Sequence, residues 1–203
     1  SLGVIRELKN ADIRTIMVTG DNILTAVSVA RDCGIVRPGE EIIRCKAEWV
    51  NNIPRVTYVK LEDRAAPDAK EAKLNMESRP YHIAIDGGSF TVICEDEQTR
   101  ASGLPYITAR GAVFARMRPE MKQHLVEILQ DMSYRVIMCG DGANDCGALK
   151  AADAGISLSE AEASVASPFT SKTPDISCVP ILIRESRCAL VTAFGLFKYM
   201  AAY

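Results

Sequence analysis

Two short apolar runs in this sequence each end in a glycine followed by an aspartate. Residues 15–18 lead into Thr19–Asp21, and residues 135–139 lead into Gly140–Asp141. An unbroken apolar run of this length is typical of a strand that is buried on both faces of a parallel sheet. The carboxyl ends of such strands open onto one crevice, where ligands bind. The pattern therefore predicts an α/β fold in which two aspartates, far apart in the sequence, meet at one site.

The chain around these runs alternates between strand and helix patterns. We expect helices over residues 2–11, 23–33, 119–132 and 143–152, and further strands over residues 113–116, 155–158 and 179–183. Strands that alternate with helices indicate a doubly wound, mostly parallel sheet, and the apolar end of the chain predicts a C-terminal helix. The 203 residues, 48% of them hydrophobic, suit one globular domain with an inserted segment.

Residues 37–111 do not follow this alternation, and we interpret them as an inserted α+β segment. Strands are expected at 56–59 and 81–85, with a turn at 86–88, and the ten charged residues of 60–80 favour a solvated, mobile loop. The predicted organisation is a core in two parts, an insert and a terminal helix, with boundaries at 1–36, 37–111, 112–183 and 184–203.

The composition excludes several functional classes. Lys and Arg number 24 against 26 Asp and Glu, so a strongly basic nucleic-acid binder is excluded. The seven cysteines include no C-x-x-C pair, which argues against a zinc cluster or a disulfide framework and favours a reducing compartment. No signal peptide opens the sequence, and no tract reaches the roughly 18 apolar residues of a membrane span.

The loops after the two apolar runs carry groups suited to phosphate chemistry. Asp141 and Asp145 lie four residues apart across a glycine-containing turn, and oxygen ligands of this kind suit Mg²⁺. Thr19 and Gly20 offer a hydroxyl and an open backbone N–H at a helix N-terminus, which suit a phosphate dianion. Lys122, in the first turn of its helix, could stabilise charge on a transferring phosphoryl group.

Purely structural interpretations of these residues remain open. Asp21 would cap the helix that follows it, and Asp145 would gain from the helix macrodipole in a first turn. Lys122 taken alone would be a solvated surface residue. Asp141 fits a capping role less well, because glycines flank it and Asn144 is the better cap for the next helix.

Three stretches together resemble the haloacid-dehalogenase phosphotransferases, and more closely the phosphorylation domain of P-type ATPases. They are residues 17–22 (Met-Val-Thr-Gly-Asp-Asn), residues 114–122 (Phe-Ala-Arg-Met-Arg-Pro-Glu-Met-Lys) and residues 140–155, which begin Gly-Asp-Gly-Ala-Asn-Asp. Residues 162–170, 183–185 and 197–200 resemble the type V subgroup, whose B branch is associated with polyamine transport in late endosomes and lysosomes. The resemblance covers 1–36 and 112–203, and covers the insert poorly.

The resemblance implies a role for each candidate residue. Asp141 would ligate Mg²⁺ with Asp145 as a second ligand or neighbour, and Lys122 would neutralise the phosphoryl group. Thr19 and Asn144 would hydrogen-bond its oxygens, Gly20 would contribute to the phosphate site, and Asp21 would hold the nucleotide or the domain hinge. ATP would be the substrate, and the residues from about 184 would be a stalk that leads to a transmembrane helix.

One departure from the family limits what the chain can do alone. The nucleophilic aspartate of the motif Asp-Lys-Thr-Gly-Thr is absent, and residues 171–174 (Ser-Lys-Thr-Pro) are no substitute. We therefore expect a fragment that neither autophosphorylates nor hydrolyses ATP by itself. Its partners would be the aspartyl phosphate, the nucleotide-binding, actuator and transmembrane domains of the parent, at the cytosolic face of a late endosomal or lysosomal membrane.

Two other functions remain open. A free-standing phosphatase of the same superfamily would need its own nucleophile, and Asp86 is the one visible candidate. A non-enzymatic module that binds Mg²⁺ or phosphate would also carry clustered carboxylates at the ends of its strands, but it would not need the apolar tail.

Overall fold

The computed structural model describes residues 1–61, 80–159 and 164–202. Its first half contains α1 (Leu2–Asn10), β1 (Met17–Val18), α2 (Ile23–Asp32), β2 (Glu41–Val50), β3 (Ile53–Leu61), β4 (Tyr81–Asp86), α3 (Gly87–Glu95) and α4 (Glu97–Arg110). The second half contains β5 (Gly111–Ala115), α5 (Pro119–Asp131), β6 (Ile137–Gly140), the 3-10 turn η1 (Ala143–Asp145), α6 (Cys146–Ala151), β7 (Ala154–Ser157), the 3-10 turn η2 (Ser164–Ala166), β8 (Phe169–Thr170) and α7 (Cys178–Ala202).

The strands form two separate sheets. The larger has the order β1-β5-β4-β2-β3, in which every pair is parallel except the β2–β3 hairpin. The smaller has the order β6-β7-β8 and is parallel throughout. Strands alternate with helices along the chain, so the predicted α/β class with a mostly parallel sheet and a C-terminal helix is confirmed.

Helices cover both faces of the larger sheet. On one face α3, α4 and α5 pack against alternate strand residues such as Ile83, Ile85 and Phe114. On the other face α1 and α2 pack against Ala84 and Val113, which point the opposite way from their neighbours. Successive side chains of a strand face opposite sides of the sheet, so one apolar run serves both cores.

The strands of the larger sheet that lie within residues 37–111 are continuous with the rest. β4 pairs with β5, and β2 pairs with β4, so both belong to the same sheet as β1. Only β3 is antiparallel, and it lies at the edge. The predicted insert therefore extends the core sheet, while its boundaries as a domain stay a prediction.

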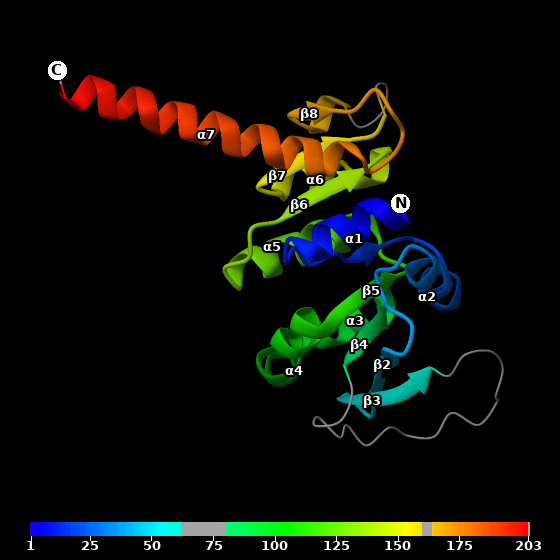
Figure 1. Ribbon diagram of the computed structural model, residues 1–203. Coiled ribbons are helices and arrows are strands. Elements are labelled where there is room, and N and C mark those ends of the chain that lie inside the picture. Colours follow the sequence, from blue (N-terminus) through cyan, green and yellow to red (C-terminus); the bar gives the residue numbers. More distant parts are fainter. Residues whose placement is uncertain (62–79, 160–163, 203) are drawn as a thin grey trace.

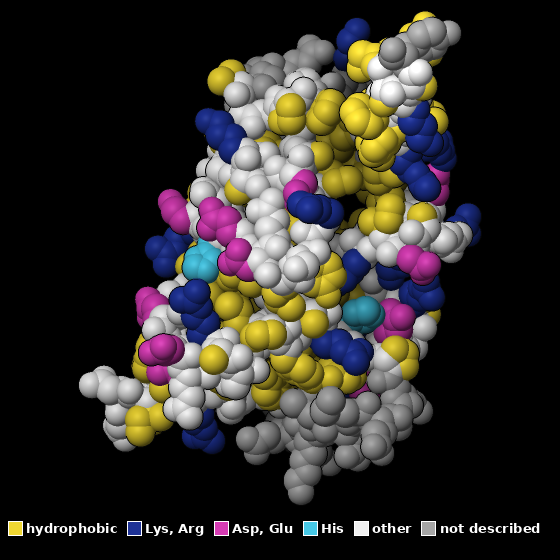
Figure 2. Space-filling view, turned by 90° about the vertical axis from the view of Figure 1, so that its left-hand side faces the viewer, with side chains coloured by type: hydrophobic (Ala, Val, Ile, Leu, Met, Phe, Trp, Pro, Cys, Tyr) yellow, Lys and Arg dark blue, Asp and Glu magenta, His cyan; other side chains and the backbone are white. Residues whose placement is uncertain are grey.

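The helix α7 leaves the body of the molecule beside the smaller sheet (Figure 1). Its first turns pack on α1 around Leu8 and Val179, and Arg184 pairs with Glu7. Further along it exposes apolar side chains, among them Leu190, Val191, Phe194, Leu196, Phe197, Tyr199 and Met200. Figure 2 shows hydrophobic groups gathered along this helix, in the upper right of the view. None of the helices in the described ranges combines the length and apolar character that a transmembrane span requires.

Most element predictions are confirmed, and three need correction. Residues 179–183 are helical: Cys178, Val179, Leu182 and Ile183 share one face, and a proline is tolerated in the first turn. Residues 86–88 begin α3 instead of making a turn, with Asp86 as its N-cap. Asn144 lies inside η1 and makes no cap bond to it or to α6. The charged loop predicted at 60–80 falls almost entirely outside the described residues.

Candidate active site at the carboxyl ends of β1 and β6

The two strands that end in Gly-Asp are both edge strands. β1 pairs with β5 on one side, and β6 pairs with β7 on one side. Within the described part of the chain, neither has a strand on its other side, and no strand joins the two sheets. An unpaired edge presents free N–H and C=O groups that can pair with another strand.

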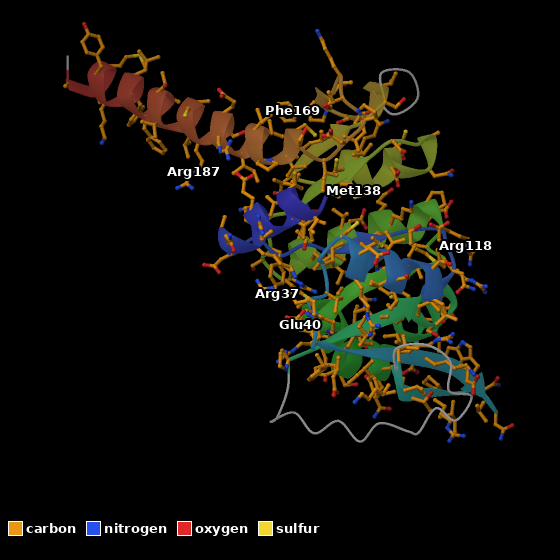
Figure 3. The ribbon with its side chains drawn as sticks, turned by 45° about the vertical axis from the view of Figure 1, so that its right-hand side comes forward. Arg37, Glu40, Arg118, Met138, Phe169 and Arg187 are labelled. Atoms are coloured by element: carbon orange, nitrogen blue, oxygen red, sulfur yellow. The ribbon has the colours of Figure 1, made fainter. Side chains whose placement is uncertain are left out.

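The carboxyl ends of β1, β5, β4 and β2, the parallel strands of the larger sheet, lie on one side of the molecule. Figure 3 shows Arg118, which follows β5, on the side opposite Arg37 and Glu40, which precede β2. Because ligands of doubly wound folds bind outside the carboxyl ends, the side of Arg118 is where a site is expected.

The loop after β1 is held by the segment that follows β5. The backbone N–H of Arg116 donates to the carbonyl of Asp21 at 2.9 Å, and that of Met117 donates to the carbonyl of Thr19 at 2.9 Å. Within the loop, the Thr19 hydroxyl donates to the Asp21 carboxylate at 3.0 Å. Gly20 has no heavy atom within 4 Å of where a Cβ would stand, so its backbone is open to a ligand.

The N-cap of α2 is a different residue from the one predicted. Asn22 accepts a hydrogen bond from the N–H of Leu24 at 2.9 Å, whereas the Asp21 carboxylate is exposed and bonded to Thr19. The structure therefore removes the capping interpretation of Asp21 and leaves its carboxylate exposed on the loop after β1.

Lys122 and Asp145 form a buried ion pair. The ammonium of Lys122, from the first turn of α5, lies 2.7 Å from Oδ1 of Asp145, and each side chain is only 11% exposed. A Cβ on Gly140 would stand 2.6 Å from the other carboxylate oxygen of Asp145, so the end of β6 lies directly beside the pair. Lys122 is therefore not a solvated surface residue, which corrects the interpretation that the sequence alone left open.

Asp141 differs from Asp145 in its surroundings. Asp141 and Asn144 are exposed on the loop between β6 and α6, whereas Asp145 is buried. Mg²⁺ takes oxygen ligands, keeps several waters and needs only one or two carboxylates, and this pair of aspartates suits that chemistry. Within the described ranges, no group of three or more Asp, Glu, His or Cys side chains forms a cage for a metal.

The candidate residues thus fall into two groups. Thr19, Gly20 and Asp21 follow β1, while Lys122, Asp145 and the Gly140–Asp141 turn lie together at the end of β6. The segment from Arg116 to Lys122 connects them, because its start holds the loop after β1 and its end reaches Asp145.

Two arginines near the first group were missed by sequence reasoning. Arg44 of β2 bonds the Asp86 carboxylate at 3.1 Å, and the side chain of Arg116 lines the same small pocket beside the start of α2. Arg116 also has a positive φ of 50°, which is uncommon outside glycine. Arg116 stands inside the quoted family stretch, but a single arginine gave no signal of its own, and Arg44 lies in the insert.

Both carboxylate oxygens of Asp86 make structural hydrogen bonds. It accepts from the N–H of Ser89 at 3.0 Å as the N-cap of α3, and from Arg44 with its second oxygen. Burial opposes ionisation, but these bonds outweigh it and lower the pKa of Asp86. Both oxygens are therefore engaged, which disfavours Asp86 as the nucleophile of a free-standing phosphatase.

Comparison with known proteins gives close relatives. The chain is 50% identical over 98% of its length to the polyamine-transporting ATPase 13A3 of Macaca fascicularis, of which it covers 17%. It is 49% identical over 98% of its length to the human protein of that name, again covering 17%. It is 44% identical over its whole length to the probable cation-transporting ATPase catp-6 of Caenorhabditis elegans, of which it covers 19%. No protein-family model matches the chain.

These relatives agree with the motif resemblance and make it more specific. The identity extends over nearly the whole chain, including the residues of the predicted insert, while the chain spans less than a fifth of the length of these relatives. The chain is therefore homologous to a segment of the P-type cation- and polyamine-transporting ATPases of the 13A family.

Proposed function

We propose that this chain is most of the phosphorylation domain of an ATP-driven cation or polyamine pump. Its site would hold the aspartyl phosphate that forms when ATP phosphorylates a residue of the parent protein. The observation that carries the proposal is the pair of free edges: β1 and β6 each lead into Gly-Asp, and among the described residues each has a neighbouring strand on one side only. A parallel strand between them would unite the two sheets and end at both loops.

The role that we propose for each residue follows from its surroundings. Lys122 is held by Asp145 in a nearly dry environment, where a fixed positive charge interacts strongly with a developing negative one. The loop of Thr19 and Gly20 offers a hydroxyl and an open backbone to phosphate oxygens, and Asn144 is exposed on the loop after β6.

Asp141 is the proposed principal ligand of Mg²⁺, with Asp145 as its neighbour. Asp141 is exposed and free to bind, whereas Asp145 is already paired with Lys122. Mg²⁺, when bound, would neutralise charge on the phosphoryl group during transfer. Asp21, exposed on the loop after β1, is proposed to contact the nucleotide.

The finer parts of the proposal rest on the resemblance and on the relatives' names. The residue ranges 1–36 and 112–183 would form the core, 37–111 the insert, and 184–203 the stalk towards a transmembrane helix. The cargo would be a polyamine or another cation, and the membrane that of late endosomes or lysosomes with this domain on its cytosolic face. The other domains of the parent would be its partners.

A complementation experiment tests the proposal. The upstream segment of a 13A relative that carries the Asp-Lys-Thr motif is co-expressed with this chain, and the complex is incubated with Mg²⁺ and ATP labelled on the γ-phosphate. We expect acid-stable, hydroxylamine-labile label on the added segment. Replacing its nucleophile by asparagine should abolish labelling, and Asp141→Asn in this chain should reduce it by at least about tenfold.

The controls separate failure of chemistry from failure of folding. A folded complex that takes up no label would overturn the proposed function. Label that survives hydroxylamine, or label on this chain, would favour a different phosphotransferase. Stable binding of Mg²⁺ and phosphate by this chain alone, without any transfer, would favour the non-enzymatic module.

A further inference from the structure

A small pocket lies at the carboxyl ends of β4 and β5, between β2 and the start of α2. Its volume is about 140 Å³, and its lining includes Arg44, Asp86 and Arg116. Residues 22–24, at the start of α2, form the remaining wall. Pockets that hold drug-sized ligands measure roughly 300–1,000 Å³, so this pocket suits a group of only a few atoms.

Arg44 carries a buried donor that no described residue satisfies. Its Nη2 donates to Oδ2 of Asp86 at 3.1 Å, which fixes one side of the guanidinium. Its Nε is buried and has no hydrogen-bond partner in the described part of the chain. Most buried donors of native proteins are paired with a protein group, water or a ligand. An acceptor in the pocket that Arg44 lines would supply the missing partner.

The backbone of Arg116 is held in an uncommon conformation beside the same pocket. Its φ is 50°, and its N–H donates to the carbonyl of Asp21 at 2.9 Å. A Cβ on Gly87 would stand 2.3 Å from its carbonyl oxygen, so the backbone is enclosed on that side as well. Strained residues of this kind cluster at ligand-binding sites. The side chain is exposed, and no ion pair joins it to a described carboxylate.

The residues that line the pocket carry a net positive charge. Arg44 and Arg116 contribute two positive charges, and Asp86 contributes one negative charge. Both oxygens of Asp86 already accept hydrogen bonds, one from the N–H of Ser89 and one from Arg44. A guanidinium presents its N–H donors in a planar fork that matches the oxygens of a phosphate group. Two guanidiniums beside a pocket of this size therefore favour a small oxyanion.

We propose that this pocket binds a single phosphate group between Arg44 and Arg116, as inorganic phosphate or as the end of a larger phosphate ester. Arg44 belongs to β2, which lies three places from β1 in the order of the larger sheet, and Lys122 and Asp145 lie beside β6 of the smaller sheet. The inference goes beyond the proposed function, because this binding requires no Mg²⁺, no nucleophile and no transfer.

The experiment follows the Nε–H group of Arg44 directly. The whole chain, labelled with ¹⁵N and kept free of Mg²⁺ by a chelator, is titrated with inorganic phosphate at constant ionic strength. The arginine Nε–H signals are recorded by NMR, and the signal that disappears in Arg44→Gln belongs to Arg44. We expect this signal to shift in a saturable way, because a phosphate oxygen accepts from Nε. Chloride at the same ionic strength should not shift it.

Matched variants test the two arginines separately. Arg116→Gln should weaken phosphate binding at least about tenfold, because one of two charge-assisted contacts is lost. Arg44→Lys should also weaken it, as followed by the amide signals of residues 22–24, because lysine keeps the charge but has no planar fork. Arg55→Gln removes an exposed positive charge from β3 and should leave the affinity unchanged. Circular dichroism confirms that each variant is folded.

A comparison of inorganic phosphate with phenyl phosphate identifies the source of the group. Tighter binding of inorganic phosphate supports a site for the free ion, and tighter binding of phenyl phosphate supports a site for the end of a larger ligand. The proposal is overturned if the Arg44 signal does not move at millimolar phosphate, which would leave water as the occupant. It is also overturned if acetate shifts the signal as strongly as phosphate does, or if Arg116→Gln weakens binding no more than Arg55→Gln does.

Discussion

Each of the two sheets has an edge strand that leads into a Gly-Asp pair, but the hydrophobic clusters that stabilise the two sheets differ greatly in size. The larger sheet lies between two apolar clusters with fifteen and twelve buried residues, whereas the cluster beside the smaller sheet contains three. The smaller sheet has four-residue strands and a two-residue edge strand. Since burial of apolar surface is the main favourable term in folding, the larger half can be stable alone and the smaller half depends on its neighbours.

The neighbours of the smaller half are α5, α1 and α7. α5 buries Leu125, Ile128 and Leu129 in the core of the larger half, and its other side contacts α6. The edge strand β6 leaves Ile137 39% exposed. Under the proposed function, a strand of the parent protein placed between β1 and β6 would cover this edge beside Asp141. The same strand would then complete both the sheet and the phosphate site.

The largest effect is expected from breaking the ion pair that joins the two halves. Lys122→Met leaves the buried carboxylate of Asp145 without its partner, and removal of one member of a buried pair costs about 3–5 kcal/mol. Urea unfolding would measure the loss, followed both by the fluorescence of Trp49, the one tryptophan, and by circular dichroism.

A double-mutant cycle identifies the source of that loss. Asp145→Asn combined with Lys122→Met should recover part of the stability, with a coupling of at least about 1 kcal/mol. If the two single effects simply add, the pair does not hold the halves together. If Trp49 fluorescence and circular dichroism change together in every variant, the two halves unfold as one unit and the contrast between them is wrong.

A smaller effect is expected from crowding the end of β6. Gly140→Ala would place a methyl group 2.6 Å from Oδ2 of Asp145 and 2.8 Å from its Cβ, so the Asp145 side chain, whose Oδ1 contacts Lys122, must shift. Overpacking of this kind costs about 1–3 kcal/mol. Gly142→Ala is the matched control, because its nearest atom is the N–H nitrogen of Asn144 at 3.9 Å and its φ is negative.

The same comparison can be made in the larger half. Gly87→Ala would meet the carbonyl oxygen of Arg116 at 2.3 Å, whereas Gly88→Ala has only an ordinary contact at 3.5 Å. Thermal unfolding of the four variants measures both pairs. Equal stability of Gly140→Ala and Gly142→Ala would contradict the close approach of β6 to Asp145.

Sequence reasoning found those elements whose apolar residues form either an unbroken run or a regular helical pattern. The apolar runs at 15–18 and 135–139, and the helix behind Pro119, are typical patterns and are confirmed as β1, β6 and α5. α4 was missed because its residues are mostly polar and it contains Pro105, although Leu104 and Ile107 are buried. β2 was missed because charged residues alternate with Ile43, Cys45 and Ala47, which is itself the pattern of a strand.

The sequence predicted which residues belong to the candidate site, but it did not predict which of them contact one another. The motifs pointed to Lys122, Asp141 and Asp145, but no spacing rule pairs Lys122 with Asp145 across 23 residues. The separation into two sheets was likewise not visible, because it depends on which strands pair. The free edges of β1 and β6 follow from the strand pairing of the described residues, and the resemblance alone suggests that a strand with the nucleophile motif is absent.

The smallest expected effect is a difference between the two halves in how their stability changes at acid pH. In the smaller half Asp153 accepts from the N–H of Val136 at 2.9 Å and from the side chains of Gln130 and Arg135, and these bonds lower its pKa. In the larger half the pKa of Asp86 is lowered as well, by Ser89 and Arg44 against the effect of burial. A depressed native pKa adds stability above the unfolded value of about 3.9, and that stability is lost as the pH falls through the native value.

Each variant should therefore make the stability of its own half depend less on pH in the acid range. Asp153→Asn should reduce the loss of stability below about pH 4 when it is followed by hydrogen exchange in α6 and β7, and Asp86→Asn should do so when it is followed by Trp49 on β2. At neutral pH Asp86→Asn should cost about 1 kcal/mol or more, because asparagine keeps the N-cap bond to Ser89 but places an amide nitrogen where the second oxygen accepts from Arg44. If either variant has this effect on both halves, acid unfolding is a property of the whole molecule, and the smaller half is no more dependent on its neighbours than the larger one.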